Sequence, residues 1–270
     1  MLYQLIINGI IIGASYALMA LGLNLIWSIT DIPDFSQGGI YVFAAYAGYF
    51  SITLVNLPYF LGLLAAMCVG GTMAFLFEVF LYRRWRGQGR IQLLCAIALF
   101  FLLSSLAILF WTPKSKIFPP SLQGAVEVLG FTVSYQRILV LVIAFVLFVL
   151  IYFFIQNTKI GKAIRASSQD REVAEIVGIN INTVNSVVFA IGGMLSSTAA
   201  MGDLPLLKSL VVVILGGFGS VAGVLVGGIG LGLVESLGSV YISAGYQHGF
   251  AFFVLIIVLL LFPRGLFGKV

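Results

Sequence analysis

A succession of apolar runs, each long enough to cross a membrane, limits the possible folds of this chain more than any other feature. The first run, Leu5–Ile29, contains no charged residue, and an α-helix needs about 20 mostly apolar residues to span a bilayer. Hydrophobic residues make up 61% of the chain and charged residues 9%, whereas soluble domains are about half apolar and about a quarter charged. A soluble core could not bury such an excess. We therefore predict an all-α, polytopic integral membrane protein.

The pattern of apolar runs predicts about eight transmembrane or near-transmembrane helices. No soluble domain fits between them, so we expect a single transmembrane domain, 1–270. The first run is not expected to be a signal peptide, because no Lys or Arg occurs before Arg83 to form a basic leading segment. The expected spans are Leu5–Ile29, Gly38–Val55, Tyr59–Tyr82, Ile91–Thr112, Ile138–Gln156, Val184–Met201, a glycine-rich tract at Leu210–Leu237, and Gly249–Phe262.

The positions of the basic residues predict the orientation of these spans. Arg83–Arg90 contains four arginines, Lys159–Arg171 contains four lysines or arginines, and the tail adds Arg264 and Lys269. The positive-inside rule places all three segments in the cytoplasm. The loop Pro113–Arg137 lies between two of them and is therefore predicted to be external, where its prolines favour an ordered, non-helical cap.

This orientation requires a break in the glycine-rich tract. If Leu206–Ser236 formed one full span, the tail would lie outside, against its basic residues. We predict that Pro205–Leu215 enters as a re-entrant half-helix that turns back or continues at an offset, and that Val221–Leu237 is the true span. Irregular backbone at membrane depth persists only where it is buried or lines a cavity, which favours a solute path here; alternatively, the glycines only allow helices to pack closely. The interrupting residues are Gly216, Gly217, Gly219 and Ser220.

One short strip, Ile155–Asn180, carries seven of the 23 charged residues of the chain. Lys159–Ala166 is predicted to form a first short helix. Ser167 or Ser168 is predicted to cap a second one, because Ser167-Ser168-Gln169-Asp170 fits a capping box. A chain that is otherwise so apolar is thus expected to place two polar helices in one cytoplasmic loop.

The second helix of this strip is predicted to be amphipathic. Val173, Ile176 and Val177 follow helical spacing and form an apolar stripe, and Gly178 is expected to end the helix. Three interpretations remain open: the helix lies on the membrane surface, belongs to a solvated loop, or docks into a groove of a soluble partner. The mixture of acidic and basic residues argues against a purely lipid-binding helix, which would be basic.

A few charged residues lie in or beside the apolar segments. Asp31 and Asp34, in ITDIPDFSQGG, are expected either to face a cavity or to form a simple interfacial turn, because acids within a bilayer are costly. Glu78 is expected to form an interfacial ion pair with Arg83. Lys208 is expected to snorkel to the interface. Glu235 is expected either to snorkel or to cap a loop.

The sequence contains no pattern for catalysis or metal binding. Cys68 and Cys95 are interpreted as small packed hydrophobes and His248 as an interfacial residue. There is no His/Cys/carboxylate cluster, no HExxH and no Walker P-loop, so we predict no enzyme, no metal and no cofactor bound by this chain. The net charge of +5 comes from basic residues beside apolar segments, which points to anionic headgroups rather than nucleic acid.

Several stretches together resemble the permeases of bacterial and archaeal branched-chain amino acid ABC transporters. NGIIIGASYALMALGLNLIW (Asn8–Trp27) and DFSQGGIYVFAAY (Asp34–Tyr46) resemble the start of that family. LGGFGSVAGVLVGGIGLGLVES (Leu215–Ser236) and FPRGLFG (Phe262–Gly268) resemble its C-terminal part. IGKAIRASSQDREVAEIVGIN resembles its cytoplasmic signature, with matches at Gly161, Ala163, Arg165, Ala166, Asp170, Ala174, Gly178, Ile179 and Asn180.

The resemblance implies the membrane half of an importer in the bacterial or archaeal cytoplasmic (inner) membrane. The implied partners are a second permease subunit, homologous or identical, two cytoplasmic ATPase subunits that bind ATP and Mg²⁺, and an extracytoplasmic solute-binding protein. The charged strip, within 157–183, would be the coupling segment that fits a groove on the ATPase. The residues assigned to coupling are Gly161, Lys162, Ala163, Arg165, Asp170, Ala174 and Gly178.

We expect the solute path to involve the turn Asp34–Gly39 and the half-helix Leu210–Ser220. Small and apolar groups with few fixed charges suit a zwitterion with an apolar side chain. The sequence departs from the family at DFSQGG, where Asn-Phe-Ala-His-Gly is more usual, and at Ser196–Ser209, which is shorter than is typical. The candidate path residues are Ser15, Tyr16, Asp34, Phe35, Ser36, Gln37, Lys208, Gly216, Gly217, Gly219 and Ser220.

Three alternatives to a branched-chain amino acid importer remain. The same kind of permease could carry urea or short-chain amides. An ion-driven secondary transporter would need carboxylates such as Asp31, Asp34 or Glu235 within its path. A membrane-embedded enzyme is disfavoured, because the sequence has no catalytic cluster.

Overall fold

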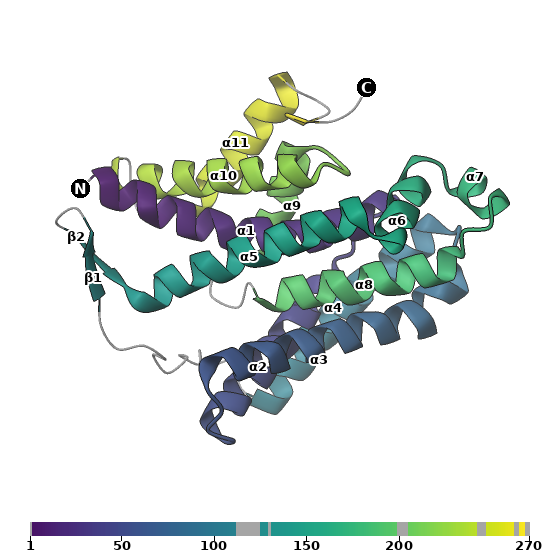
Figure 1. Ribbon diagram of the computed structural model, residues 1–270, viewed down its shortest axis with the longest axis horizontal. Coiled ribbons are helices and arrows are strands. Elements are labelled where there is room, and N and C mark those ends of the chain that lie inside the picture. Colours follow the sequence, from purple (N-terminus) through teal and green to yellow (C-terminus); the bar gives the residue numbers. More distant parts are fainter. Residues whose placement is uncertain are drawn as a thin grey trace. The chain divides into compact units, whose positions relative to one another are not determined.

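The computed structural model describes residues 2–111, 125–128, 131–198, 205–241, 247–261 and 265–267. Within this part of the chain α-helices dominate, as predicted (Figure 1). Five helical segments are long and apolar enough to cross a membrane by length and composition, and two further apolar helices, Leu206–Gly216 and Gly249–Leu261, are shorter. The five are Leu2–Thr30, Tyr59–Trp85, Gly89–Trp111, Arg137–Asn157 and Val221–Tyr241.

The chain forms two compact units, which are described separately. The first comprises Met1–Leu21, Pro120–Val149 and Asp203–Val270, and the second comprises Gly22–Pro119 and Leu150–Gly202. Two long helices, α1 (Leu2–Thr30) and α5 (Tyr135–Asn157), contribute to both units.

The second unit is built around α3 (Tyr59–Phe80), which packs against α2 (Ser36–Thr53) and most extensively against α8 (Ile181–Thr198). Close approach depends on small residues: a Cβ added at Gly70 of α3 would lie 2.7 Å from the Gly193 carbonyl oxygen of α8. The 3₁₀ turn η1 (Tyr82–Trp85) follows α3 and leads to α4 (Gly89–Trp111), which packs on α2. Small residues are the usual means by which membrane helices approach without a hydrophobic driving force.

The two short helices of the charged strip belong to this second unit. They are α6 (Lys159–Gln169) and α7 (Arg171–Ile176), and they connect α5 to α8. Both contact α8. A displacement of these helices would therefore act directly on α8, which is the main partner of α3.

The first unit contains the N-terminal part of α1, together with α9 (Pro205–Gly216), α10 (Val221–Tyr241) and α11 (Gln247–Leu261). Glycines again set the contact between α1 and α10, because a Cβ added at Gly13 would lie 2.5 Å from the carbonyl oxygen of Gly228. The contacts Gly9–Leu233 and Gly13–Gly228 show that α1 and α10 run in opposite directions.

The predicted break in the glycine-rich tract is confirmed. The helix α9 has 12 residues, or about 18 Å, which is shorter than the roughly 30 Å hydrocarbon core. The backbone then reverses through Gly217 and Gly219, at φ angles of 88° and 74° that L side chains rarely adopt. Gly216 lies directly against Gly223 of α10. The half-helix turns back onto α10 rather than continuing at an offset, which is one of the two arrangements predicted for it.

The loop between α4 and α5 contains an element that the sequence analysis did not predict. The strands β1 (Ala125–Val128) and β2 (Phe131–Ser134) pair in antiparallel register, Ala125 with Ser134, and lead directly into α5 (Figure 1). This agrees with a non-helical structure in that part of the loop. The prolines at 113, 119 and 120, the side chain of His248, and the basic residues of the tail lie outside the described residues.

Candidate functional site

The first helix of the charged strip is held close to the end of α5. The Thr158 side chain caps it by accepting a hydrogen bond of 2.9 Å from the Gly161 backbone N–H. A Cβ at Gly161 would lie 2.4 Å from the carbonyl oxygens of Phe154 and Ile155, so only glycine fits there. Arg165 donates a 2.6 Å hydrogen bond to the Gln156 side chain. Two of the predicted coupling residues, Gly161 and Arg165, thus fix how α6 leaves α5, while Lys162 is exposed and Ala163 is half-buried.

The cap of the second helix differs from the prediction. Neither Ser167 nor Ser168 caps α7, because α6 continues as far as Gln169 and the Ser168 hydroxyl donates back to the Arg165 carbonyl within that helix. The N-cap is Asp170, whose carboxylate accepts a 3.0 Å hydrogen bond from the Val173 N–H. The acid that was expected to complete a capping box is itself the cap, and it separates two consecutive helices.

The predicted apolar stripe at α7 is exposed for more than half of the surface of each side chain. Val173, Ile176 and Val177 have relative exposures of 52%, 83% and 69%, whereas Ala174 is buried toward the rest of the unit. Gly178 ends the helix with a φ of 88°, as predicted. Val173 and Ile176 lie on the six-residue α7 and Val177 is its C-cap, so the stripe leaves three aliphatic side chains largely exposed beside one another.

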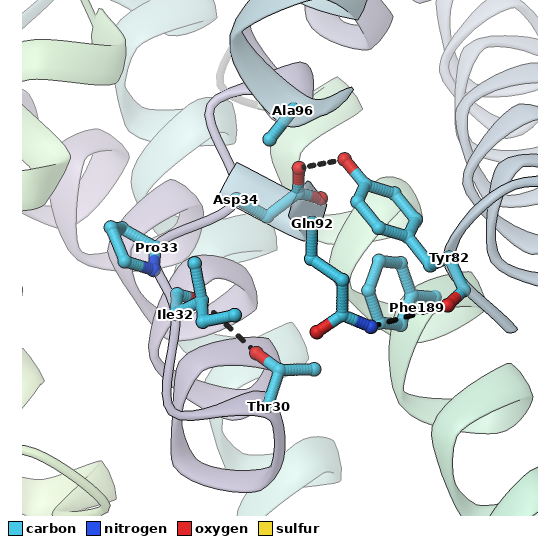
Figure 2. Close-up of a pocket in the computed structure, with 8 residues that line it drawn as sticks. All are labelled: Thr30, Ile32, Pro33, Asp34, Tyr82, Gln92, Ala96 and Phe189. Atoms are coloured by element: carbon cyan, nitrogen blue, oxygen red, sulfur yellow. Dashed lines mark hydrogen bonds between the residues drawn. The ribbon is translucent and has the colours of Figure 1, made fainter. Parts of the chain in front are cut away.

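A buried carboxylate and a small pocket lie at the turn between α1 and α2 (Figure 2). Asp34 is 3% exposed and accepts hydrogen bonds from the Tyr82 hydroxyl at 2.7 Å, the Ser36 N–H at 3.0 Å and the Gln37 side-chain amide at 3.2 Å. Burial raises the pKa of the Asp34 carboxyl, and these hydrogen bonds act in the opposite direction. The pocket is lined by Thr30, Ile32, Pro33, Asp34, Tyr82, Gln92, Ala96 and Phe189.

The predicted path residues that follow Asp34 face into the second unit. Ser36 and Gln37 are completely buried at the start of α2, while Phe35 is half-buried. The Gln37 side-chain oxygen accepts a 2.6 Å hydrogen bond from Ser196 of α8. The turn is therefore tied to η1 through Tyr82 and to α8 through Gln37, and both partners were missed because they lie far away in the sequence.

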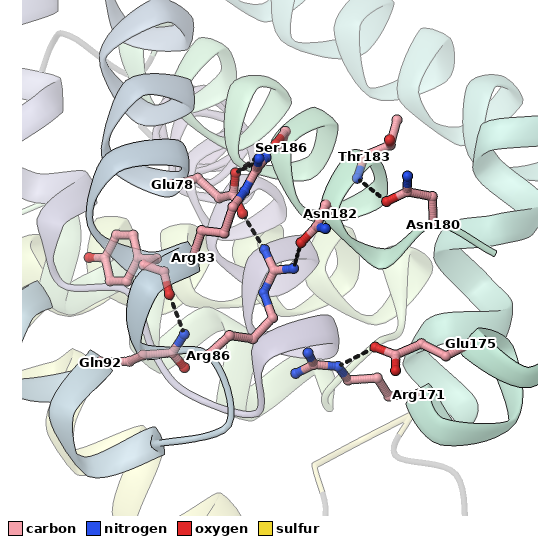
Figure 3. A network of polar contacts seen from close by, with 11 residues as sticks. Glu78, Arg83, Arg86, Gln92, Arg171, Glu175, Asn180, Asn182, Thr183 and Ser186 are labelled. Carbon is pink, nitrogen blue, oxygen red and sulfur yellow. Dashed lines mark hydrogen bonds and ion pairs between the residues drawn. The ribbon is translucent and has the colours of Figure 1, made fainter. Parts of the chain in front are cut away.

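A second buried carboxylate, Glu78, forms a polar network at the end of α3 (Figure 3). The predicted ion pair with Arg83 is present at 3.4 Å. Glu78 also pairs with Arg86 and accepts a 2.6 Å hydrogen bond from Ser186 of α8. Arg86 in turn donates to Asn182 at the start of α8. The network fixes the loop after α3 to the part of α8 that directly follows α7.

A third buried carboxylate lies in the first unit and overturns two expectations. Lys208 and Glu235 do not snorkel, and Glu235 does not cap a loop: both are buried and form an ion pair of 2.9 Å. The Tyr16 hydroxyl accepts a 2.7 Å hydrogen bond from Lys208 and donates a 3.0 Å hydrogen bond to Glu235. The cluster joins α1, α9 and α10. Lys208 and Tyr16 had each been expected as path residues, but their contact with each other and with Glu235 had not been predicted.

The remaining path candidates have mainly backbone roles. The Ser15 hydroxyl donates to the Ile11 carbonyl within α1. Ser220 accepts a 3.0 Å hydrogen bond from the Gly223 N–H and so caps α10. Gly217 and Gly219 form the turn described above, and the Leu266 N–H donates to the Leu215 carbonyl at the end of α9. The structure thus places Ser36 and Gln37 at Asp34 and places Tyr16 and Lys208 at Glu235, whereas Ser15 and the glycine turn belong to neither cluster.

The described residues contain no group of three or more His, Cys, Asp or Glu side chains that could hold a metal ion. Both cysteines are unpaired, and Cys68 is exposed on α3 rather than packed as expected. The polar clusters are therefore built from carboxylates, hydroxyls, amides and basic side chains.

Comparisons with known proteins agree with one another. The family described as branched-chain amino acid transport system / permease component matches residues 5–259. The high-affinity branched-chain amino acid transport system permease protein BraD of Pseudomonas aeruginosa is 30% identical over 98% of this chain and 95% of its own length. LivH of Escherichia coli is 26% identical over 98% and 95%, and the probable LivH of Methanocaldococcus jannaschii is 25% identical over 98% and 92%. No solved structure matches the chain significantly.

Proposed function

The chain belongs to the family of branched-chain amino acid transport permease components, and from this premise we propose that it forms the membrane path of an ATP-driven importer for branched-chain or related neutral amino acids. It is a non-catalytic, multi-pass membrane subunit of a bacterial or archaeal transport system. Such a subunit acts with an ATPase and a solute-binding protein. We treat 1–270 as one transmembrane permease domain with its coupling segment within 157–183.

One observation carries the coupling part of this proposal: the exposed apolar stripe of α7. Its side chains are held in place by the Asp170 cap and by the turn at Gly178, and they remain 52–83% exposed. A short helix with an uncovered apolar face between charged flanks suits a groove on a soluble protein. The sequence has no P-loop, so a partner of this kind would supply ATP hydrolysis.

Within the second unit, the contacts provide a route from α7 to the candidate path. The connection after α7 is short, and Asn180 caps α8 by accepting a 3.2 Å hydrogen bond from the Thr183 N–H. Farther along α8, Ser186 contacts Glu78, and Ser196 contacts Gln37 beside Asp34. We propose that closure of an ATPase dimer moves α6 and α7, that α8 follows as a rigid element, and that the Asp34 turn changes its position in response.

The finer composition of the assembly is also part of the proposal. We propose two permease subunits, this chain with an identical or a homologous one, above two cytoplasmic ATPase subunits, with an extracytoplasmic protein that delivers the solute. The transport-system names of the relatives support an assembly of several components. Much of the solute selectivity would then reside in the binding protein.

A substitution in the stripe tests the coupling. Ile176→Asp should reduce co-purification with the ATPase and ATP-dependent uptake by at least about tenfold, because interface hot spots contribute about 2 kcal/mol or more. Ile176 is 83% exposed, so the variant should keep the stability of the isolated permease. Ala174→Pro, which breaks α7, and Arg165→Glu should also impair coupling.

Glu175→Gln is the matched control, because Glu175 is exposed on α7 about half a turn from the stripe. Its ion pair with Arg171 lies at the surface, where such pairs contribute little. Normal assembly and uptake with Ile176→Asp would contradict the proposal. So would uptake that persists without any ATPase and stops when the ion gradient is dissipated.

A further inference from the structure

The buried carboxylates of the described residues differ in one respect. There are three of them, Asp34, Glu78 and Glu235. Glu78 pairs with Arg83 and Arg86, and Glu235 pairs with Lys208. Asp34 forms no ion pair with any described Lys or Arg side chain, although it is as buried as the others. Its counter-charge is therefore missing from the described part of the chain.

The neutral groups around Asp34 stabilise a carboxylate but do not neutralise it. Tyr82, Ser36 and Gln37 all donate hydrogen bonds to its oxygens. Hydrogen bonds to an anion favour its charged form, yet buried charges in proteins are as a rule paired with an opposite charge. The Asp34 carboxylate is fixed in position by these hydrogen bonds and has no cationic partner among the described residues. It is therefore a suitable binding group for a cationic ligand.

The pocket beside Asp34 suits an organic ammonium group. The rings of Tyr82 and Phe189 line it with their centroids 5.1 Å apart, and aromatic faces attract cations. Gln92 donates its amide N–H to the Tyr82 carbonyl, and Figure 2 shows the Gln92 side chain extending into the pocket. The remaining wall contains apolar groups, Ile32, Pro33 and Ala96 among them.

No basic side chain is among the residues that line the pocket. Two arginines that follow α3, Arg83 and Arg86, pair with Glu78 instead. The pocket therefore presents negative charge, aromatic faces and apolar surface, and no group that would favour an isolated carboxylate. A hard metal cation would require several more oxygen ligands than Asp34 and Gln92 provide.

We propose that the Asp34 pocket, whose enclosed space of about 10 Å³ holds one water-sized group, binds the ammonium group of the transported solute, with the apolar body of the solute at the rim, against the half-buried Ile32 and Pro33. The ligand class is a small molecule with a primary ammonium group and an aliphatic side chain. This inference rests on the proposed transport function and makes it more specific, because urea and simple amides carry no positive charge for Asp34 to pair with.

Calorimetric titration of the purified, detergent-solubilised transporter complex tests the proposal with three probes that share one carbon skeleton. Leucine carries both charged groups, isopentylamine lacks the carboxylate, and isocaproate lacks the ammonium group. We expect leucine and isopentylamine to bind and isocaproate not to bind. Asp34→Asn should weaken binding of both amines by about tenfold to a hundredfold, which is the usual effect of losing a hydrogen bond to a charged group.

Asp31→Asn is the matched control. Asp31 lies in the same turn but is exposed, and its φ of 58° is well tolerated by Asn. It should therefore leave the binding of both amines unchanged. If Asp34→Asn does not fold, Ala96→Leu provides the second variant, because it narrows the pocket without removing the carboxylate and should also weaken amine binding.

Several outcomes would overturn the proposal. The first is unchanged amine binding by a folded Asp34→Asn or Ala96→Leu variant. The second is that isocaproate binds as tightly as isopentylamine. The third is that titration with sodium chloride gives a heat of binding whereas titration with the amines gives none. Failure of this inference can be distinguished from failure of the proposed function. ATP-dependent leucine uptake by the same complex, reconstituted with Asp34→Asn and retaining its wild-type rate and KM, would leave the importer intact and remove only the ammonium site.

Discussion

Asp34 and Glu235 are both buried carboxylates, but their surroundings offset the cost of burying a negative charge in different ways. Glu235 has the Lys208 ammonium 2.9 Å away and shares the Tyr16 hydroxyl with it. Asp34 has only neutral donors and borders a pocket. A charge that is neutralised within the chain stabilises the arrangement of its helices, whereas a charge without an internal partner remains available to a ligand.

The Glu235 cluster explains why the half-helix α9 holds its position. A helix of 12 residues cannot cross a membrane by itself, and α9 contributes one polar side chain, Lys208, to a contact with α1 and α10. Breaking a buried pair by removing one partner leaves the other charge unpaired, which is more costly than replacing both by apolar groups. The difference in stability between single and double variants of a buried ion pair therefore tests whether Glu235, unlike Asp34, depends on a basic partner.

The largest effect is expected for Lys208→Met. The substitution leaves Glu235 buried without its counter-charge, and we expect the free energy of unfolding to fall by about 3–5 kcal/mol. The double variant Lys208→Met, Glu235→Leu should recover most of this loss. Reversible unfolding in mixed micelles measures both values, and Lys159→Met, at an exposed lysine of α6, should stay within about 0.5 kcal/mol of the wild type. A double variant that is no more stable than Lys208→Met alone would contradict the interpretation.

A smaller effect is expected for Tyr16→Phe. The variant keeps the ring but removes the hydroxyl that contacts both Lys208 and Glu235. Side-chain hydrogen bonds between membrane helices contribute about 0.6 kcal/mol on average and about 1.7 at most, so the loss of stability should lie in this range. Tyr3→Phe, at an exposed tyrosine of the same helix, serves as the control. A loss as large as that of Lys208→Met would mean that the hydroxyl, rather than the ion pair, holds the cluster together.

The change in stability expected for Asp34→Asn without ligand is smaller than that for Lys208→Met. Because Asp34 has no counter-charge to lose, the free energy of unfolding should fall by only about 1–3 kcal/mol, the cost of leaving the buried Gln37 amide without its acceptor. The same variant should lose most of its affinity for isopentylamine. A destabilisation comparable to that of Lys208→Met would show that Asp34 is a structural group, and the distinction between the two carboxylates would then fail.

The predictions that held depended on local patterns. The apolar spacing that begins at Val173 and the helix-ending Gly178 predict α7. The ion pair Glu78–Arg83 joins residues that are only five positions apart in the sequence. The break at Gly217 and Gly219 was visible because only glycine readily takes the backbone angles of such a turn. Each of these features is decided by residues that are close in the sequence.

The predictions that failed concerned which of several adjacent residues caps a helix, and which residues far apart in the sequence contact one another. Asp170 replaced the serines as N-cap because α6 extended through them. Lys208 and Glu235 are 27 positions apart, and only the reversal between α9 and α10 brings them together. Tyr82 and Ser196 were missed as partners of the Asp34 turn because their contacts cross between helices.

Sequence patterns alone were enough to predict a helical membrane protein with a broken helix near its end and a polar, two-helix loop between spans. Hydropathy, helical spacing and glycine content depend on residues that are close in the sequence, so the features that follow from them can be predicted from the sequence. Contacts between distant parts of the chain were needed to show which buried carboxylates have a basic partner and which one has none among the described residues. That distinction depends on a few ångströms between side chains of different helices, because both the attraction between charges and the cost of burying them change steeply over that distance.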